Sequence, residues 1–123
     1  MTGNEKLVFE FISDDNLTTK CQFLPNDGRP MIKISAEPSE IERHIIIKRG
    51  GAKKLRGGIF FHTTSQERSN LHLYGEFVNE REQTIKTYAG NNPPMAFIPT
   101  ELKITIAPRK TPLDLQINIM VYR

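Results

Sequence analysis

The chain has 123 residues, of which 37% are hydrophobic and 25% are charged, as expected for a soluble globular protein. This length predicts a single β-domain over residues 1–123. No apolar run is long enough to cross a bilayer, and the first residues lack the apolar segment of a secretory signal. The single cysteine, Cys21, excludes an internal disulfide, and we interpret it as a small buried hydrophobic residue.

The net charge of +3 is concentrated in one glycine-rich loop. Five basic residues lie within nine positions that contain no acidic residue: Lys48, Arg49, Lys53, Lys54 and Arg56. The rest of the chain therefore carries a charge of −2. Glycines allow backbone amides and cations to approach phosphate closely, so this loop is the candidate binding site for nucleic acid, an anionic membrane or a neighbouring subunit. The alternative is a solvated hairpin loop, because short basic runs are weak motifs.

Apolar and polar residues alternate along most of the chain, which is typical of strands with one buried face. In chain order, we expect strands at 6–12, 18–24, 31–36, 44–48, 59–63, 71–78, 84–88, 102–107 and 113–122. One helical turn is expected at 38–42, where Ser39 and Glu42 fit a capping box. The pattern predicts an all-β fold, a single antiparallel β-sandwich that is jelly-roll-like and has about eight strands.

The last segment shows the alternation most clearly. Its apolar residues share one face: Leu113, Leu115, Ile117, Ile119 and Val121. Asp114, Gln116 and Asn118 lie on the other face. We therefore expect a core that includes Ile104, Ile106, Leu115, Ile117 and Ile119.

Motifs of catalytic or metal-binding sites are missing from the sequence. It has no nucleophile elbow, phosphate-binding loop or dinucleotide fingerprint. The three histidines, His44, His62 and His72, lack the spacing of metal ligands, and Glu40 and Glu42 fit a solvated connection. We therefore expect no enzyme activity, no catalytic residues, no metal site and no cofactor.

Several features between Gly58 and Tyr122 occur in a recognisable order. They are the strand Ile59-Phe60-Phe61, the strand Leu71–Val78, the step Tyr88-Ala89-Gly90, the run Met95–Pro99 and the closing strands Leu102–Ile106 and Pro112–Tyr122. This order resembles the C-terminal half of small viral single-jelly-roll coat proteins, such as the vertex (penton) and capsid-associated proteins of tailless, membrane-containing bacteriophages. The chain departs from them at Asn91–Pro94, where a glycine–aromatic pair is expected.

The resemblance implies a structural virion protein, a capsid subunit of the vertex or capsid-associated type. Its partners would be itself, as a homo-oligomer such as a pentamer, and other coat proteins, with no small-molecule substrate. Two other functions are considered: a nucleic-acid-binding β-barrel that uses the basic loop at 48–56, and a carbohydrate-binding β-sandwich module. The expected location is the virion, or otherwise the cytoplasm, as a soluble protein without a signal peptide.

Overall fold

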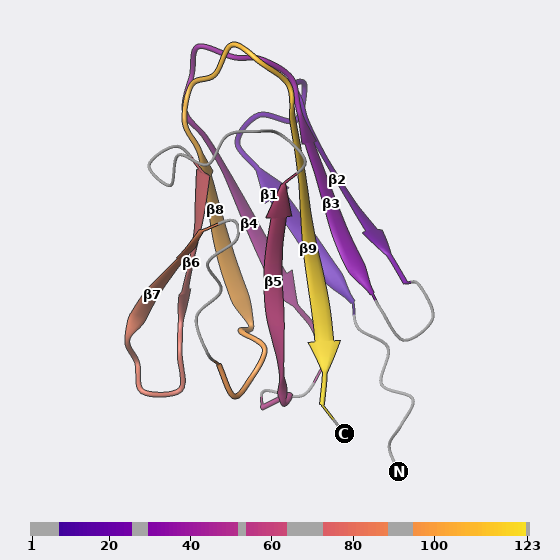
Figure 1. The fold of residues 1–123 in the computed structure, drawn as a ribbon, viewed down its shortest axis with the longest axis vertical. Coiled ribbons are helices and arrows are strands. Elements are labelled where there is room, and N and C mark those ends of the chain that lie inside the picture. The colour runs from indigo at the N-terminus through magenta and orange to yellow at the C-terminus, as the bar shows by residue number, and fades with distance from the viewer. Residues whose placement is uncertain (1–7, 26–29, 52–53, 64–72, 89–94, 123) are drawn as a thin grey trace.

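The fold is a sandwich of two antiparallel β-sheets, seen in a computed structural model that describes residues 8–25, 30–51, 54–63, 73–88 and 95–122 (Figure 1). The described strands are β1 (Phe9–Ser13), β2 (Thr19–Leu24), β3 (Met31–Ala36), β4 (Arg43–Arg49), β5 (Gly57–Thr63), β6 (Leu73–Val78), β7 (Thr84–Tyr88), β8 (Glu101–Ile106) and β9 (Leu113–Val121). The predicted all-β, sandwich-type fold class is confirmed, and each of the nine expected strand segments overlaps one of the nine strands of the described residues.

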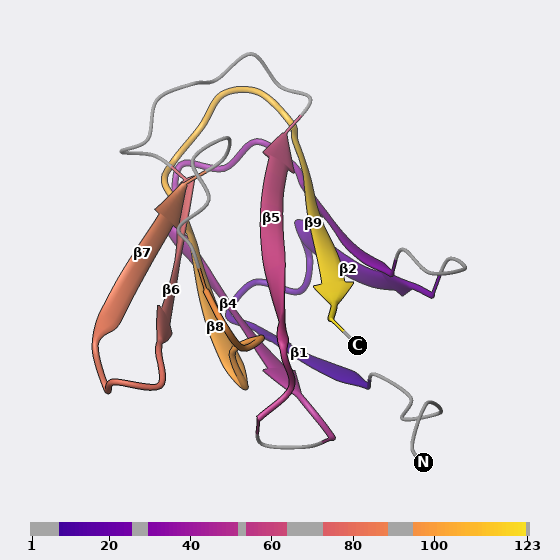
Figure 2. The ribbon, with the colours of Figure 1, turned by 60° about the horizontal axis from the view of Figure 1, so that its bottom comes forward.

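Strands distant in sequence lie side by side in both sheets. The five-stranded sheet has the order β1-β4-β8-β6-β7, and the four-stranded sheet has the order β2-β3-β9-β5. In the four-stranded sheet, β9 lies between β3 and β5, and Ile117 is opposite both Ile32 and Phe61. Figure 2 shows the two layers from the end at which β9 finishes, with the β6–β7 hairpin far from β1.

Two connections cross between the sheets together at the other end of the sandwich, at the top of Figure 1. Ser39, between β3 and β4, and Arg109, between β8 and β9, exchange backbone hydrogen bonds of 3.0 and 2.9 Å. The Arg109 guanidinium also donates to the carbonyl of Thr111 at 2.8 Å. The helical turn predicted at 38–42 is wrong, because the backbone of Ser39 pairs with this distant segment instead.

The core between the sheets is built from the inward residues of the strands. It comprises Ile32, Ile34, Ala36, Ile45, Ile47, Ile59, Phe61, Leu73, Phe77, Ile98, Leu102, Ile104, Ile106, Leu113, Leu115, Ile117 and Ile119. All five core residues predicted from the alternation are among them. Val121 continues the same face of β9 but is 39% exposed, because it ends the strand at the rim of the sandwich.

A buried cation lies at the start of β4. The Arg43 side chain is fully buried, and its Nη1 donates to the Glu37 carbonyl at 2.8 Å and to the Thr18 hydroxyl at 3.1 Å. The same hydroxyl donates to the Asp15 carboxylate at 2.6 Å. That hydrogen bond, assisted by the Arg43 charge, lowers the pKa of Asp15. Thr18 therefore links the buried charge to a carboxylate and fastens the β1–β2 turn to β4.

Cys21 on β2 is partly buried against the core, and this burial raises the pKa of its thiol from 9.0 to about 11. Because the thiolate is the reactive form, iodoacetamide at pH 9 should alkylate the folded protein roughly fifty times more slowly than the unfolded protein. Equal rates in native buffer and in urea would contradict the burial of this thiol.

The same shift predicts the pH dependence of stability. The unfolded chain releases the thiol proton first, so it binds fewer protons than the folded chain between pH 9 and 11. The free energy of unfolding should therefore fall over this range, and a Cys21→Ala variant should lose that part of the fall. An unchanged pH profile in the variant would show that the thiol titrates alike in both states.

Candidate functional site

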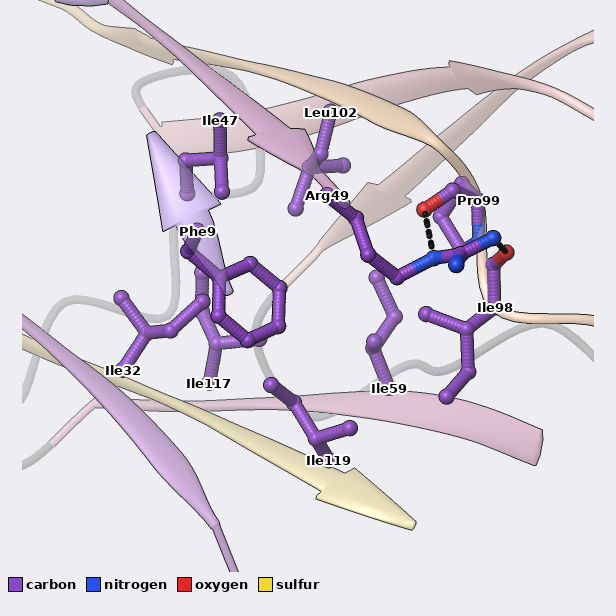
Figure 3. A pocket seen from close by; sticks show the side chains of 10 residues that line it. All are labelled: Phe9, Ile32, Ile47, Arg49, Ile59, Ile98, Pro99, Leu102, Ile117 and Ile119. Atoms are coloured by element: carbon purple, nitrogen blue, oxygen red, sulfur yellow. Dashed lines mark hydrogen bonds between the residues drawn. The ribbon is translucent and has the colours of Figure 1, made fainter. Parts of the chain in front are cut away.

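Arg49, one of the five predicted basic-site residues, is a structural residue. It is 8% exposed at the end of β4. Its Nε donates to the Pro99 carbonyl at 3.3 Å, Nη1 to the Gly50 carbonyl at 3.0 Å and Nη2 to the Ile98 carbonyl at 3.2 Å. Figure 3 shows the guanidinium directed at the segment that holds Pro99 and Ile98. Arg49 therefore joins β4 to this segment.

The other four basic residues do not gather around Arg49. Lys48 is exposed on the opposite face of β4, in register between Glu10 of β1 and Glu101 of β8, which oppose its charge. Lys54 and Arg56 are exposed, and Lys53 lies outside the described residues. Anion binding by this loop therefore stays a prediction, and within the described part of the loop it concerns Lys54 and Arg56.

An apolar pocket lies beside the Arg49 side chain, between the two sheets (Figure 3). It is lined by Phe9, Ile32, Ile47, Arg49, Ile59, Ile98, Pro99, Leu102, Ile117 and Ile119. Its volume is about 20 Å³, enough for one water molecule. Because this volume holds no more than one water molecule, we interpret the pocket as a packing gap.

A larger apolar surface lies outside the same end of the sandwich, around Gly58 of β5. A Cβ atom on Gly58 would lie 3.6 Å from the Cγ of Met95 and 3.6 Å from the hydroxyl oxygen of Tyr122, so both side chains lie over this glycine. Met120 is directly opposite Gly58 on β9. We call Gly58, Met95, Phe97, Met120 and Tyr122, with Phe60 next along β5, the Gly58 patch.

Backbone pairing explains why the members of the Gly58 patch meet. The segment that follows Met95 runs beside the start of β5, where the Gly57 amide donates to the Ala96 carbonyl at 3.2 Å and the Ile98 amide donates to the Leu55 carbonyl at 2.8 Å. Alternation along this segment sends Ile98 into the core and leaves Phe97 opposite Arg56. The segment thus extends the four-stranded sheet and widens its outer surface.

The side chains of the Gly58 patch reach solvent, while Gly58 itself is buried beneath Met95 and Tyr122. Met120 is 49% exposed and Tyr122 is 45% exposed, and Phe60, Met95 and Phe97 are partly exposed. Contiguous apolar surface of this kind marks an interaction site, whereas single exposed apolar residues are ordinary. Sequence reasoning missed the patch because Met95 and Phe97 come from a segment that is distant from β5 in the sequence. The sequence did contain one indication of the patch: Met120 and Tyr122 continue the face of β9 that carries the polar residues Asp114, Gln116 and Asn118.

The described residues provide little for other chemistry. They contain no group of three or more His, Cys, Asp and Glu side chains placed to hold a metal ion. His44 has its Nδ1 2.9 Å from the Asp14 carboxylate, while His62 lies on β5 and His72 outside the described part. Over the same parts of the chain, no helix has the length and apolar character needed to span a membrane.

Comparison with known proteins gives one similarity to report. Over 95 residues, or 77% of the chain, it is 30% identical to the peptidyl-prolyl cis-trans isomerase Mip of Chlamydia pneumoniae. These residues make up 33% of that protein, so the chain spans about a third of its relative's length. No protein-family profile and no solved structure matches the chain.

This similarity corrects the functional interpretation of the sequence. The inferred relation to viral coat proteins is wrong, and so is the structural virion function derived from it, because the similarity is to an isomerase. The expectation of no enzyme activity is contradicted by the same similarity, and the nucleic-acid-binding and carbohydrate-binding alternatives are set aside with it. The physical cause is that alternating strands and proline-ended loops recur in β-sandwiches of any function.

Proposed function

We propose that this protein binds proline-containing peptides and catalyses the cis–trans isomerisation of their X–Pro bonds, with the Gly58 patch as the peptide-binding surface. The observation that carries the proposal is the 30% identity over 95 residues to a peptidyl-prolyl cis-trans isomerase. Because the chain spans about a third of that protein, the activity is assigned to this chain as a proposal of its own.

The chemistry of the Gly58 patch suits a prolyl ring. Proline-containing segments dock on surfaces lined by aromatic side chains, because the ring is apolar and already restricted in conformation. Phe97 and Tyr122 supply aromatic groups, and Met95 and Met120 supply flexible thioethers that adapt to an irregular ligand. Gly58 is buried beneath Met95 and Tyr122, so a prolyl ring would pack against these two side chains on the outer face of β5.

Isomerisation makes and breaks no covalent bond. Its barrier of about 18–20 kcal/mol arises from the partial double bond between the carbonyl carbon and the nitrogen. A surface accelerates the rotation if it binds the twisted bond better than the planar one. An apolar environment disfavours the charge-separated planar form, and a donor can bind the lone pair that twisting localises on the nitrogen. The Tyr122 hydroxyl, above Gly58, is the donor that we assign to this role.

The test is the rate at which a short proline peptide relaxes from cis to trans, followed by NMR exchange or after a solvent jump. We expect the rate to rise in proportion to protein concentration above the uncatalysed rate, whose time constant is tens to hundreds of seconds. Tyr122→Phe should lower the catalysed rate about tenfold, because it removes the donor and keeps the ring.

Two variants separate this site from a nonspecific effect. Met120→Ala should weaken peptide binding, because it removes part of the apolar surface. Leu17→Ala is the matched control, since Leu17 is 90% exposed in the β1–β2 turn at the opposite end of the sandwich. A relaxation rate that does not depend on protein concentration would overturn the proposed function. Catalysis that survives both Tyr122→Phe and Met120→Ala would overturn the choice of the Gly58 patch.

A further inference from the structure

Arg56 lies at the border of the Gly58 patch, two residues before Gly58 and opposite Phe97. Arg56 is exposed, and within the described parts of the chain its side chain has no ion pair or hydrogen bond. Its backbone is held from both sides, because it forms a β-bridge with Phe97 and its carbonyl accepts a hydrogen bond of 2.9 Å from the amide of Tyr122. A fixed backbone with a free charged end is suited to receiving a ligand.

No acidic residue occupies the described strand positions next to the Gly58 patch, so none of them opposes the charge of Arg56. Among the described residues of the β5–β9 face, the strand positions next to the patch are Asn118, opposite Phe60, and Met120, opposite Gly58, and neither is acidic. The acid on the outer face of β9 is Asp114, near the start of that strand, where its carboxylate accepts a hydrogen bond from Ser35 at 3.4 Å. The patch therefore combines an apolar surface with positive charge.

The distance between Arg56 and Gly58, at the start of β5, indicates which peptides the Arg56 charge can recognise. Arg56 and Gly58 are two residues apart on one face, so their Cα atoms are about 6.7 Å apart at about 3.3–3.4 Å per residue. Adjacent residues of a peptide have Cα atoms about 3.8 Å apart. With a prolyl ring packed on the Met95 and Tyr122 side chains that cover Gly58, an acidic side chain on the residue before it can meet the Arg56 guanidinium. A planar guanidinium binds a carboxylate through two parallel hydrogen bonds, which a lysine cannot do.

We propose that the Gly58 patch selects peptides in which an acidic residue directly precedes the proline, with Arg56 as the residue that determines this specificity. This inference rests on the proposed function, because it assumes that the patch binds a prolyl ring. It adds the substrate class, which the similarity to Mip does not supply.

The experiment measures dissociation constants by fluorescence anisotropy for four labelled peptides, Ala-Glu-Pro-Phe, Ala-Gln-Pro-Phe, Ala-Lys-Pro-Phe and Ala-Glu-Ala-Phe. We expect the Glu-Pro peptide to bind about tenfold more tightly than the Gln-Pro peptide at low salt, and the Lys-Pro peptide to bind more weakly still. Arg56→Gln should remove this preference, so that the Glu-Pro and Gln-Pro peptides bind the variant with equal affinity. Arg56→Lys should restore only part of it, because the charge remains and the paired hydrogen bonds are lost.

Arg81→Gln is the matched control. Arg81 is also an exposed arginine, but it lies in the β6–β7 turn, at the far edge of the other sheet. This variant should keep the full preference for the Glu-Pro peptide. Circular dichroism and thermal unfolding of both glutamine variants check that they are folded, as expected for side chains on the surface.

The outcomes separate the two proposals. Equal affinity for the Glu-Pro, Gln-Pro and Lys-Pro peptides would overturn the acidic specificity and leave the proposed function standing. Equal affinity for Glu-Pro and Glu-Ala would overturn proline recognition, and with it the proposed function, even if Arg56 binds the carboxylate. A Glu-Pro preference that Arg56→Gln leaves intact would overturn the assignment to Arg56. Binding of none of the four peptides would overturn both proposals.

Discussion

Replacing Gly57 by alanine is expected to lower the free energy of unfolding by about 3 kcal/mol or more, the upper range for overpacking. The new methyl group would overlap the backbone carbonyl oxygen of Met120 and lie 2.9 Å from the Cδ1 of Ile98. Neither neighbour can move easily. The oxygen belongs to the backbone of β9, and Ile98 is buried in the core and joined through its amide to Leu55. Urea denaturation followed by circular dichroism measures the loss.

Gly58→Ala is the internal control for this prediction. A methyl group on Gly58 would meet Met95 and Tyr122 at 3.6 Å, an ordinary van der Waals distance. We therefore expect this variant to remain within about 0.5 kcal/mol of the wild type, because the added methyl group fits beneath Met95 and Tyr122 without displacing them. Two adjacent glycines should thus respond very differently to the same added methyl group. A Gly57→Ala variant as stable as Gly58→Ala would show that β5 and β9 do not approach each other as described.

The strands were predictable because their cause is local. The expected strands at 31–36 and 84–88 coincide with β3 and β7, since alternation and turn residues mark both ends. At β5 the expected start was two residues late, because Gly57 and Gly58 read as part of a flexible loop. In the structure they pair with Val121 and Met120 of β9. Whether a glycine belongs to a strand depends on its partner, which is distant in sequence.

The arrangement of the strands could not be predicted in the same way. Alternation shows which side chains share a face of one strand, but it does not identify the neighbouring strand. Ala36 pairs with Leu113, although most of the chain lies between these two residues in the sequence. The Ser39–Arg109 bridge is a further example, because local capping residues suggested a helix at a position held by a distant strand connection. At Ser39, the long-range backbone pairing prevailed over the local preference for a helical turn.

The candidate site was predicted in part. A run of charge located the basic loop, but the strand predicted at 44–48 ended before Arg49, which the structure places in β4. The burial of Arg49 was not visible, because its acceptor carbonyls come from Ile98 and Pro99, far along the chain. The Gly58 patch also forms only because the segment that contains Ile98 and Pro99 lies beside β5. The burial of Arg49 and the place of Met95 and Phe97 in the patch both follow from one long-range contact, which local sequence patterns do not identify.

Replacing Ile117 by alanine is expected to cost about 2–5 kcal/mol of folding free energy, the range for removing a large buried aliphatic side chain. Ile117 is 0% exposed on the central strand β9, and its neighbours in register are Ile32 and Phe61. It also lines the apolar pocket of about 20 Å³ beside Arg49 (Figure 3). The space left by the lost side chain would therefore join an existing gap, which places the expected loss in the upper half of this range.

Met120→Ala on the same strand is the matched control, because methionine and isoleucine have similar volumes and Met120 faces outward with 49% of its surface exposed. Its loss should stay below about 1 kcal/mol, since little apolar area leaves a buried environment. Both variants should keep the circular dichroism spectrum of the wild type, which is that of a β-sheet protein. They should differ in the midpoint of urea denaturation. Because the side chains of β9 alternate between core and solvent, a one-residue error in register would exchange the two effects. A loss below about 0.5 kcal/mol for Ile117→Ala would place this residue on the surface and contradict the pairing of β9 with β3 and β5.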